Sequence, residues 1–197
     1  MFIAHLPAGW LATHALLRRR AVDVSTRARL LRLGLIASVL PDFDLAWFYL
    51  VDGQRHVHHA YLTHKPGAWL IALAVAVLVV VALLGFVGSA SVARFIPRDA
   101  PPQPQLARQR RAGRTAWLAL AVFGTNVMLH LVLDSTAGGI RWLWPASEAE
   151  FALAHPTARH QPWYLNFVLH WTFALELLIT AAAAASLWMR HRGRDVG

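Results

Sequence analysis

One helical stripe in the sequence carries residue types that bind divalent metal ions. Asn126, His130 and Asp134 follow one another at intervals of four residues, so a helix would place them on a single face. An imidazole and a carboxylate one turn apart can coordinate the same metal ion. A pair of this kind can also hydrogen-bond two membrane helices together, and the stripe alone leaves that alternative open.

A second group of acids lies in the motif LPDFD, residues 40–44. Pro41 removes a backbone hydrogen bond, so we expect a helix through this motif to kink or break there. A break would allow both Asp42 and Asp44 to turn inward, which a regular helix would not. The alternative is a helix that ends at Pro41, with Asp42 as a cap; it accounts for one aspartate better than for two.

A histidine-rich loop, QRHVHHAYLTHK, occupies residues 54–65 and contains His59 and His64, with His56 and His58 beside them. A loop of this kind is weak evidence for a site when it stands alone, but this one follows the Asp42–Asp44 motif closely. The chain has no cysteine, which excludes thiolate metal sites and disulfide scaffolds. Any metal site must therefore use nitrogen and oxygen ligands.

The elements that carry these residues are predicted to cross a membrane. The chain has 197 residues, of which 57% are hydrophobic and 15% charged, and its mean hydropathy is +0.43. A soluble domain has about 45–50% apolar and about 25% charged residues. Apolar stretches near the length of about 20 residues that spans a bilayer predict an all-α, polytopic protein with about five transmembrane helices. The predicted spans are residues 1–17, 33–51, 67–88, 115–133 and 162–189.

The arginines set the predicted orientation. Of the 19 basic residues, 15 follow the first, third and fifth apolar stretches, and the positive-inside rule places them in the cytoplasm. The N-terminus is then outside, the C-terminus is cytoplasmic, and residues 94–114 form a cytoplasmic loop in a single membrane-embedded domain, residues 1–197. A net charge of +9 can also indicate nucleic-acid binding, but arginines that flank each inner helix end explain it better. We therefore expect membrane lipids, and no nucleic acid, as partners.

In this topology the acids and imidazoles converge at one level of the membrane. With a rise of about 1.5 Å per residue, segments far apart in sequence all deliver them to the outer half. An acid inside a bilayer costs several kcal/mol and is usually functional, so protonation, imidazolium or a metal ion must compensate it. The expected metal ligands are His5, Asp42, Asp44, His59, His64, His130 and Asp134, with His170 and Glu176 as reserves. Seven ligands exceed one tetrahedral zinc site, so we expect one or two divalent ions, zinc first among them.

The order of these motifs resembles a known family. The motif LPDFD, then His59-x4-His64 with Thr63, then His130-x3-Asp134, then Gly139 and Leu143-Trp144-Pro145 are similar to LPDID, HRGxTHS, H-x3-D and G-x3-LWP of the metal-dependent inner-membrane hydrolases of the LexA-binding, YdjM type. His5 resembles the N-terminal histidine of that family. The resemblance covers residues 1–145 and implies a bacterial inner-membrane hydrolase. The chain departs from the pattern at Leu45, at Ala60-Tyr61 and at Lys65-Pro66. A more distant similarity is to the helical, zinc-dependent phospholipase C class.

These observations predict a metal-dependent hydrolase that acts on an ester, a phosphoester or a lipid, at the outer face of the membrane. Asp44 or Glu176 would be the catalytic residue that accepts a proton from water. One alternative is a proton- or ion-coupled transporter, because intramembrane acids and histidines also build ion paths. The other is a non-catalytic membrane protein stabilised by a structural metal.

Overall fold

The computed structural model describes residues 3–56, 58–88, 104–157, 159–162 and 164–192. These residues form an all-helical protein, as predicted, and within them the one β-type pairing is an isolated antiparallel bridge between Ile140 and Phe151. The elements are α1 (His5–Leu17), α2 (Val24–Ala37), η1 (Pro41–Phe43), α3 (Asp44–Leu50), η2 (His58–Ala60), η3 (Leu62–His64), α4 (Pro66–Gly88), α5 (Pro104–Asp134), α6 (Leu165–Val168) and α7 (Trp171–Arg192).

Three helices, α4, α5 and α7, are long and apolar enough to cross a membrane. A fourth span exists if α2 and the η1–α3 segment count as one, with a bend of 53° between them. None of the 18-residue apolar window of α4 is buried in the protein, and an apolar helix that leaves so much of its surface exposed requires lipid as its solvent. Helix α1, in the first predicted span (residues 1–17), has 13 residues and a length of about 20 Å, too short to be counted among these spans. The count of five therefore stays a prediction.

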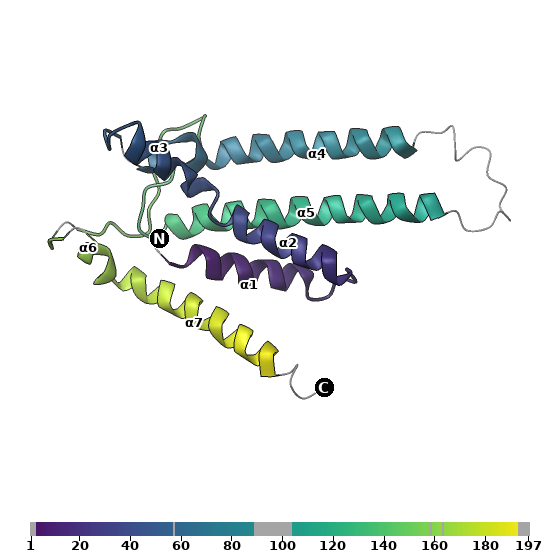
Figure 1. The fold of residues 1–197 in the computed structure, drawn as a ribbon. Coiled ribbons are helices and arrows are strands. Elements are labelled where there is room, and N and C mark those ends of the chain that lie inside the picture. The colour runs from purple at the N-terminus through teal and green to yellow at the C-terminus, as the bar shows by residue number, and fades with distance from the viewer. Residues whose placement is uncertain (1–2, 57, 89–103, 158, 163, 193–197) are drawn as a thin grey trace.

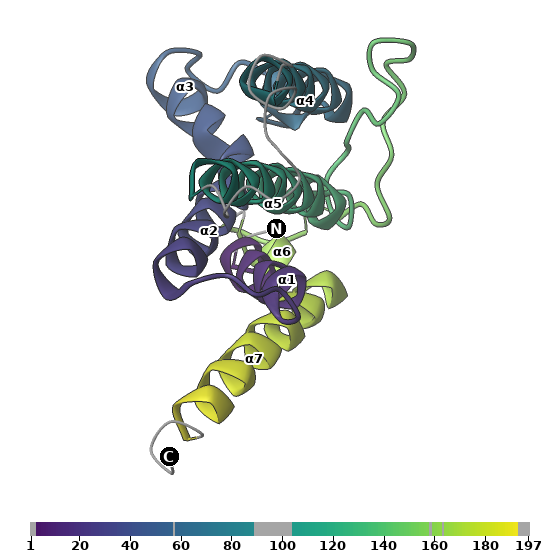
Figure 2. The ribbon, with the colours of Figure 1, turned by 90° about the vertical axis from the view of Figure 1, so that its right-hand side faces the viewer.

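Helix α5 lies at the centre of the bundle (Figures 1 and 2). It packs against α1, α2 and α4, and α7 in turn packs against α1. Two glycines permit the close approach of α1 and α2. A Cβ at Gly34 would collide with the hydroxyl of Thr13, and one at Gly9 would collide with Ser38. The Thr13 hydroxyl also accepts a hydrogen bond from Asn126 Nδ2 at 3.0 Å, which ties α1 to α5.

The break at Pro41 occurs as the sequence predicts. Helix α2 ends at Ala37, and Pro41 occupies a first-turn position of η1, where its missing N–H costs nothing. Asp42 does not cap this turn through its side chain. The helix-cap alternative for Asp42 therefore does not hold.

Two predicted boundaries are wrong. Helix α5 begins at Pro104, so residues 104–114 are helical and not a loop, while their cytoplasmic location stays a prediction; residues 94–103 lie outside the described part of the chain. Helix α7 begins at Trp171, nine residues after the predicted start at Pro162, because the short α6 and a turn at His170 interrupt the apolar stretch. In both cases hydropathy failed to mark where the helix starts.

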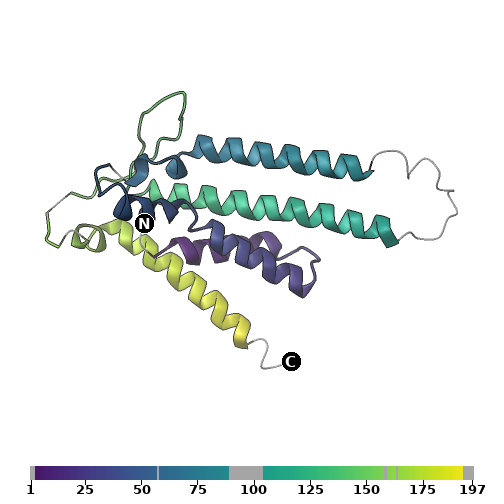
Figure 3. The same cartoon turned by 45° about the horizontal axis from the view of Figure 1, so that its top comes forward.

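The elements that carry the LPDFD motif, the histidine-rich loop and the His130–Asp134 pair gather at one end of the molecule (Figure 3). The end of α5, the break after α2, the short helices η2 and η3, and the start of α1 all lie there. Residues 135–157 leave α5 at this end as an extended loop, in which the Ile140–Phe151 bridge and an ion pair between Arg141 and Glu148 at 2.6 Å fix the path of the chain.

Candidate metal centre

Four side chains at this end direct one ligand atom each toward a common point. Asp42 comes from η1, His64 from η3, and His130 and Asp134 from the last two turns of α5. Their ligand atoms all lie within 4.8 Å of one another. We call this set the four-ligand group. It joins segments that are up to 92 residues apart in sequence.

The spacing within the four-ligand group fits a tetrahedral metal ion. Nε2 of His130 lies 3.0 Å from Asp134 Oδ2 and 3.6 Å from Asp42 Oδ1. Nε2 of His64 lies 3.5 Å from Asp134 Oδ2 and 3.6 Å from Asp42 Oδ1. Zinc bonds to nitrogen and oxygen of about 2.0–2.2 Å in a tetrahedron place ligand atoms about 3.3–3.5 Å apart. The four atoms are therefore close to the positions that one divalent ion requires.

The two imidazoles of the group are oriented through their other ring nitrogen. Nδ1 of His130 donates to the backbone carbonyl of Ser38 at 2.8 Å, and Nδ1 of His64 donates to Asp44 Oδ2 at 2.8 Å. These partners assign the proton to Nδ1 and leave the Nε2 lone pair directed at the centre. Both Nε2 atoms are buried and have no hydrogen bond within the described part of the chain. Metal-binding histidines usually have this second contact to a carboxylate or carbonyl.

Asp44 lies behind the four-ligand group. Besides His64, its carboxylate accepts a hydrogen bond from the hydroxyl of Thr63, and its Oδ1 lies 3.1 Å from Nδ1 of His58. Asp44 was predicted both as a ligand and as a proton acceptor. In the structure it orients two imidazoles.

A second group of ring nitrogens, from His58, His59 and His64, shares His64 with the first. Nε2 of His58 lies 3.3 Å from Asp42 Oδ1, and Nε2 of His59 lies 3.8 Å from Asp134 Oδ2. This group is the open side of the centre, because His58 and His59 are 22% and 19% exposed while His64 is fully buried. His59 was predicted as a ligand from the sequence, whereas His58 was not. The adjacent histidines of the loop were the signal, since a 3-10 turn brings both to the same site.

His5 closes the side of the centre formed by α1. Its ring stacks on His130 with centroids 3.9 Å apart, and its Nε2 lies 3.2 Å from Asp134 Oδ1. His5 is buried. It therefore reaches the carboxylate oxygen of Asp134 that is not directed at the four-ligand group.

The two reserve residues lie elsewhere. Glu176, buried on α7, accepts a hydrogen bond from the backbone N–H of Ile3 at 2.7 Å. Nδ1 of His170 accepts a hydrogen bond from the hydroxyl of Thr172 at 2.9 Å. Neither residue belongs to the two groups of potential ligands among the described residues.

The charges of the centre are balanced by imidazole. Asp42 and Asp44 form ion pairs with histidines alone in the described part of the chain. Burial by itself would lower the pKa of His64, but the carboxylates of Asp134, Asp42 and Asp44 raise it to about 10. Burial lowers the pKa of His59 to about 4. Although burial disfavours its charged form, the carboxylates of Asp42 and Asp44 also raise the pKa of His58. In the absence of a metal ion, the imidazolium of His64, supported by His58, therefore compensates the aspartates.

The chain matches one family of inner membrane proteins. The family model described as YdjM inner membrane protein matches residues 1–194, so the resemblance extends beyond residue 145 and includes α7. No curated protein and no solved structure matches the chain, and the similarity to the zinc-dependent phospholipase C class stays a prediction. The match over nearly the full length, together with several apolar helices, identifies the chain as a member of the YdjM inner membrane protein family, a multi-pass protein of the bacterial inner membrane.

Proposed function

We propose that this protein is a metal-dependent hydrolase whose substrate is a phosphoester or another ester of a lipid, reached from the outer face of the membrane. The observation that supports the proposal most directly is the four-ligand group, in which each His Nε2 lies 3.0–3.6 Å from both carboxylate oxygens and all four ligand atoms lie within 4.8 Å of one another.

The four-ligand group would hold one divalent ion, and zinc suits its nitrogen and oxygen ligands and its spacing. His58 and His59 lie beside Asp42 and Asp134 and could hold a second ion. Zinc supplies a Lewis acid and lowers the pKa of a coordinated water to about 7. The remaining chemistry belongs to side chains of the chain.

The proton acceptor in this proposal is the pair formed by His58 and Asp44. His58 is partly exposed, with Nδ1 at 3.1 Å from the carboxylate of Asp44. The carboxylate would keep Nδ1 protonated. Nε2 faces Asp42 Oδ1 at 3.3 Å, so it would accept a proton from water once Asp42 is committed to a metal ion. Asp44 would then act through His58, as a positioning residue. The hydrogen bond from Ile3 gives Glu176 a more natural role in anchoring the segment before α1.

The surroundings of the open side favour a lipid substrate. Phe43, Trp47 and Leu50 belong to η1 and α3 and are all exposed. Exposed aromatic and aliphatic side chains beside a polar site are typical of the membrane interface. A substrate with acyl chains could remain in the outer leaflet while its ester approaches His58 and His59.

A structural metal site is the second candidate, and one observation favours it. Four protein ligands complete a tetrahedron, whereas catalytic zinc sites usually have three and keep one position open. Asp42 is the ligand with the greatest exposure, 27%, so a catalytic site requires Asp42 to yield its position or a second ion to bind at His58 and His59. A transporter has less support, because the buried polar side chains of α1 and α5 on the inner side of the centre are Thr13 and Asn126, which bond to each other.

The deciding experiment measures metal content and hydrolysis on the same preparation. Full-length protein in detergent is analysed for bound metals and assayed with a chromogenic phosphodiester and with phospholipid micelles, before chelation, after chelation and after zinc is restored. We expect stoichiometric metal and activity that is lost and regained with it. Bound metal without turnover of either substrate class would support the structural site, and metal-free folded protein would overturn both.

A further inference from the structure

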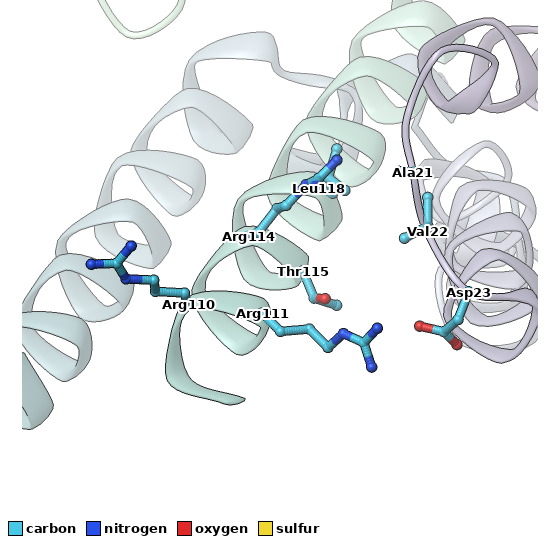
Figure 4. Close-up of a pocket in the computed structure, with 8 residues that line it drawn as sticks. All are labelled: Ala21, Val22, Asp23, Arg110, Arg111, Arg114, Thr115 and Leu118. Carbon is cyan, nitrogen blue, oxygen red and sulfur yellow. The ribbon is translucent and has the colours of Figure 1, made fainter. Parts of the chain in front are cut away.

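A pocket lies at the end of α5 opposite to the metal centre (Figure 4). Its volume is about 290 Å³, and it lies between α5 and the connection from α1 to α2. The lining includes Val22 and Asp23 from the connection, and Arg111, Arg114 and Leu118 from α5. None of these residues belongs to the metal centre.

The helix presents one continuous face to this pocket. Arg111, Arg114, Thr115 and Leu118 are spaced as i, i+3, i+4 and i+7, so they lie on one side of α5. Leu118 and Val22 pack against the buried core cluster of Leu17, Leu30 and Val122. The pocket therefore has an apolar floor and a cationic rim.

The charge of the rim is positive and unpaired. Three arginines, including Arg110, and one carboxylate, Asp23, line the pocket, which gives a net charge of +2. Within the described residues none of the three arginines forms an ion pair with an acid. Figure 4 shows Arg111 directed across the pocket toward Asp23, while Arg110 turns away on the other side of α5. We therefore assign the binding role to Arg111 and Arg114.

Asp23 has a structural role of its own. Its Oδ1 accepts hydrogen bonds from the Ser25 hydroxyl at 2.6 Å and from the backbone N–H of Thr26 at 2.9 Å, and it caps the N-terminus of α2. These donors lower the pKa of Asp23, so its carboxylate is ionised at neutral pH. It would repel an anion in the pocket, although the two opposing guanidinium groups outweigh it.

The depth of the pocket indicates its ligand. Arg111 precedes His130 by 19 residues on the same helix, a distance of about 28 Å. The hydrocarbon core of a bilayer is about 30 Å thick. When the metal centre lies near one interface, the pocket lies among the headgroups of the other leaflet, which the positive-inside rule predicts to be cytoplasmic. Guanidinium groups bind phosphate with paired hydrogen bonds.

We propose that this pocket binds the phosphate headgroup of an anionic phospholipid. Arg111 and Arg114 hold the phosphate, the Thr115 hydroxyl offers a further donor, and the apolar floor receives the first carbons of the glycerol and acyl chains. The site is independent of metal binding and of hydrolysis, and it would seat the inner end of α5 against α1 and α2.

The test uses full-length protein in neutral detergent, titrated with phosphatidylglycerol and followed by native mass spectrometry. Each basic residue at an anionic surface strengthens binding by roughly a factor of five. We therefore expect the Arg111→Gln/Arg114→Gln variant to bind about 30-fold more weakly. The matched control is Arg29→Gln/Arg32→Gln, because these two arginines are exposed on α2 with the same spacing and do not line the pocket. An equal loss in both variants would mean that general surface charge, and not the pocket, binds the lipid, and would overturn the proposal.

Two further arms identify the ligand. Asp23→Asn keeps a good helix cap and removes the opposing charge, so we expect tighter binding of phosphatidylglycerol; weaker binding would contradict an anion site. Phosphatidylethanolamine at the same concentration should bind less, and inorganic phosphate in the millimolar range should not displace the lipid. Equal binding of phosphatidylethanolamine, or displacement by inorganic phosphate, would overturn the assignment of the pocket to an anionic lipid.

Discussion

At the scale of single residues, the carboxylates of the centre pair with histidine side chains, and not with lysine or arginine, in the described part of the chain. Asp134 illustrates this, with His130 at 3.0 Å, His5 at 3.2 Å and His64 at 3.5 Å. An imidazole can release its proton and remain as a metal ligand, whereas a guanidinium cannot. The same side chains can therefore balance the carboxylates in the metal-free protein and coordinate a divalent ion.

Substitution of Asp134 tests this arrangement. Asp134→Asn retains the size of the side chain and removes the charge shared by three imidazoles. Loss of a side chain that only supports a ligand costs about 10–100-fold in metal affinity, so we expect at least that loss for zinc, and no measurable hydrolysis. The fold should persist, because no buried charge is left without compensation.

The control for this prediction is His191→Ala, in the last turn of α7 and far from the centre. It should leave metal content and activity unchanged. If Asp134→Asn kept its zinc while the helices separated in detergent, Asp134 would be a contact between helices and not a ligand.

The protonation of His64 predicts a pH dependence of metal binding. Its pKa of about 10 means that the metal-free protein carries the imidazolium at pH 7, and zinc must displace that proton. Zinc affinity should therefore rise with pH between 6 and 8, about tenfold per unit for each proton released. Calorimetry in two buffers of different ionisation enthalpy measures the released proton directly; an affinity that is constant over this range would contradict the role of His64.

At the scale of elements, breaks in helices position the ligands. The turn at Pro41 places Asp42 beside the end of α5, and the short helices η2 and η3 fold the histidine-rich loop back over it. The sequence predicted the break, because proline has a local and specific effect. It could not predict that His58 joins the site or that Asp44 lies behind His64, because these depend on how the loop folds.

Close packing of α1, α2 and α5 gives the prediction at this scale. In Gly34→Ala the new methyl group would collide with Thr13 and disturb its hydrogen bond to Asn126, so we expect a loss of about 1–3 kcal/mol of unfolding free energy. Gly85→Ala on α4 is the matched control, since nothing lies within 4 Å of its Cβ position. Thermal unfolding in detergent measures both; equal stability of the two variants would show that the helices can separate at Gly34 without cost.

At the scale of the whole molecule, α5 relates the two ends. It carries His130 and Asp134 at one end and the arginines of the pocket at the other. Hydropathy and charge in the sequence were enough to predict that the metal-binding residues and the arginines lie at opposite ends of this helix. They could not fix the number of spans, because α1 is short and α2 continues into η1 and α3 only through a bend of 53°.

The position of His5 helps to decide whether α1 crosses the membrane, which hydropathy does not settle. Its contact with Asp134 places the start of α1 at the level of the metal centre, and the arginines that follow Leu17 place its end toward the other face. Although α1 is only about 20 Å long, it covers most of the hydrocarbon thickness. The predicted location of the later loops is the same whether α1 counts as a span or not, because the positive-inside rule predicts residues 18–20 to be cytoplasmic in both cases.

Reporter fusions therefore test the topology as a whole. Fusions at Arg110 and at the C-terminus should report a cytoplasmic location, because basic residues flank both positions. Fusions at Gln54 and Glu150 should report an external location, since both lie in loops at the end of the metal centre. A fusion at Leu78 is the control, because only part of α4 precedes the reporter and the span is therefore incomplete. An external location of the reporter at Arg110 would mean that the orientation of the protein is opposite to the predicted one. The metal centre would then open to the cytoplasm, and its substrate would have to come from the inner leaflet.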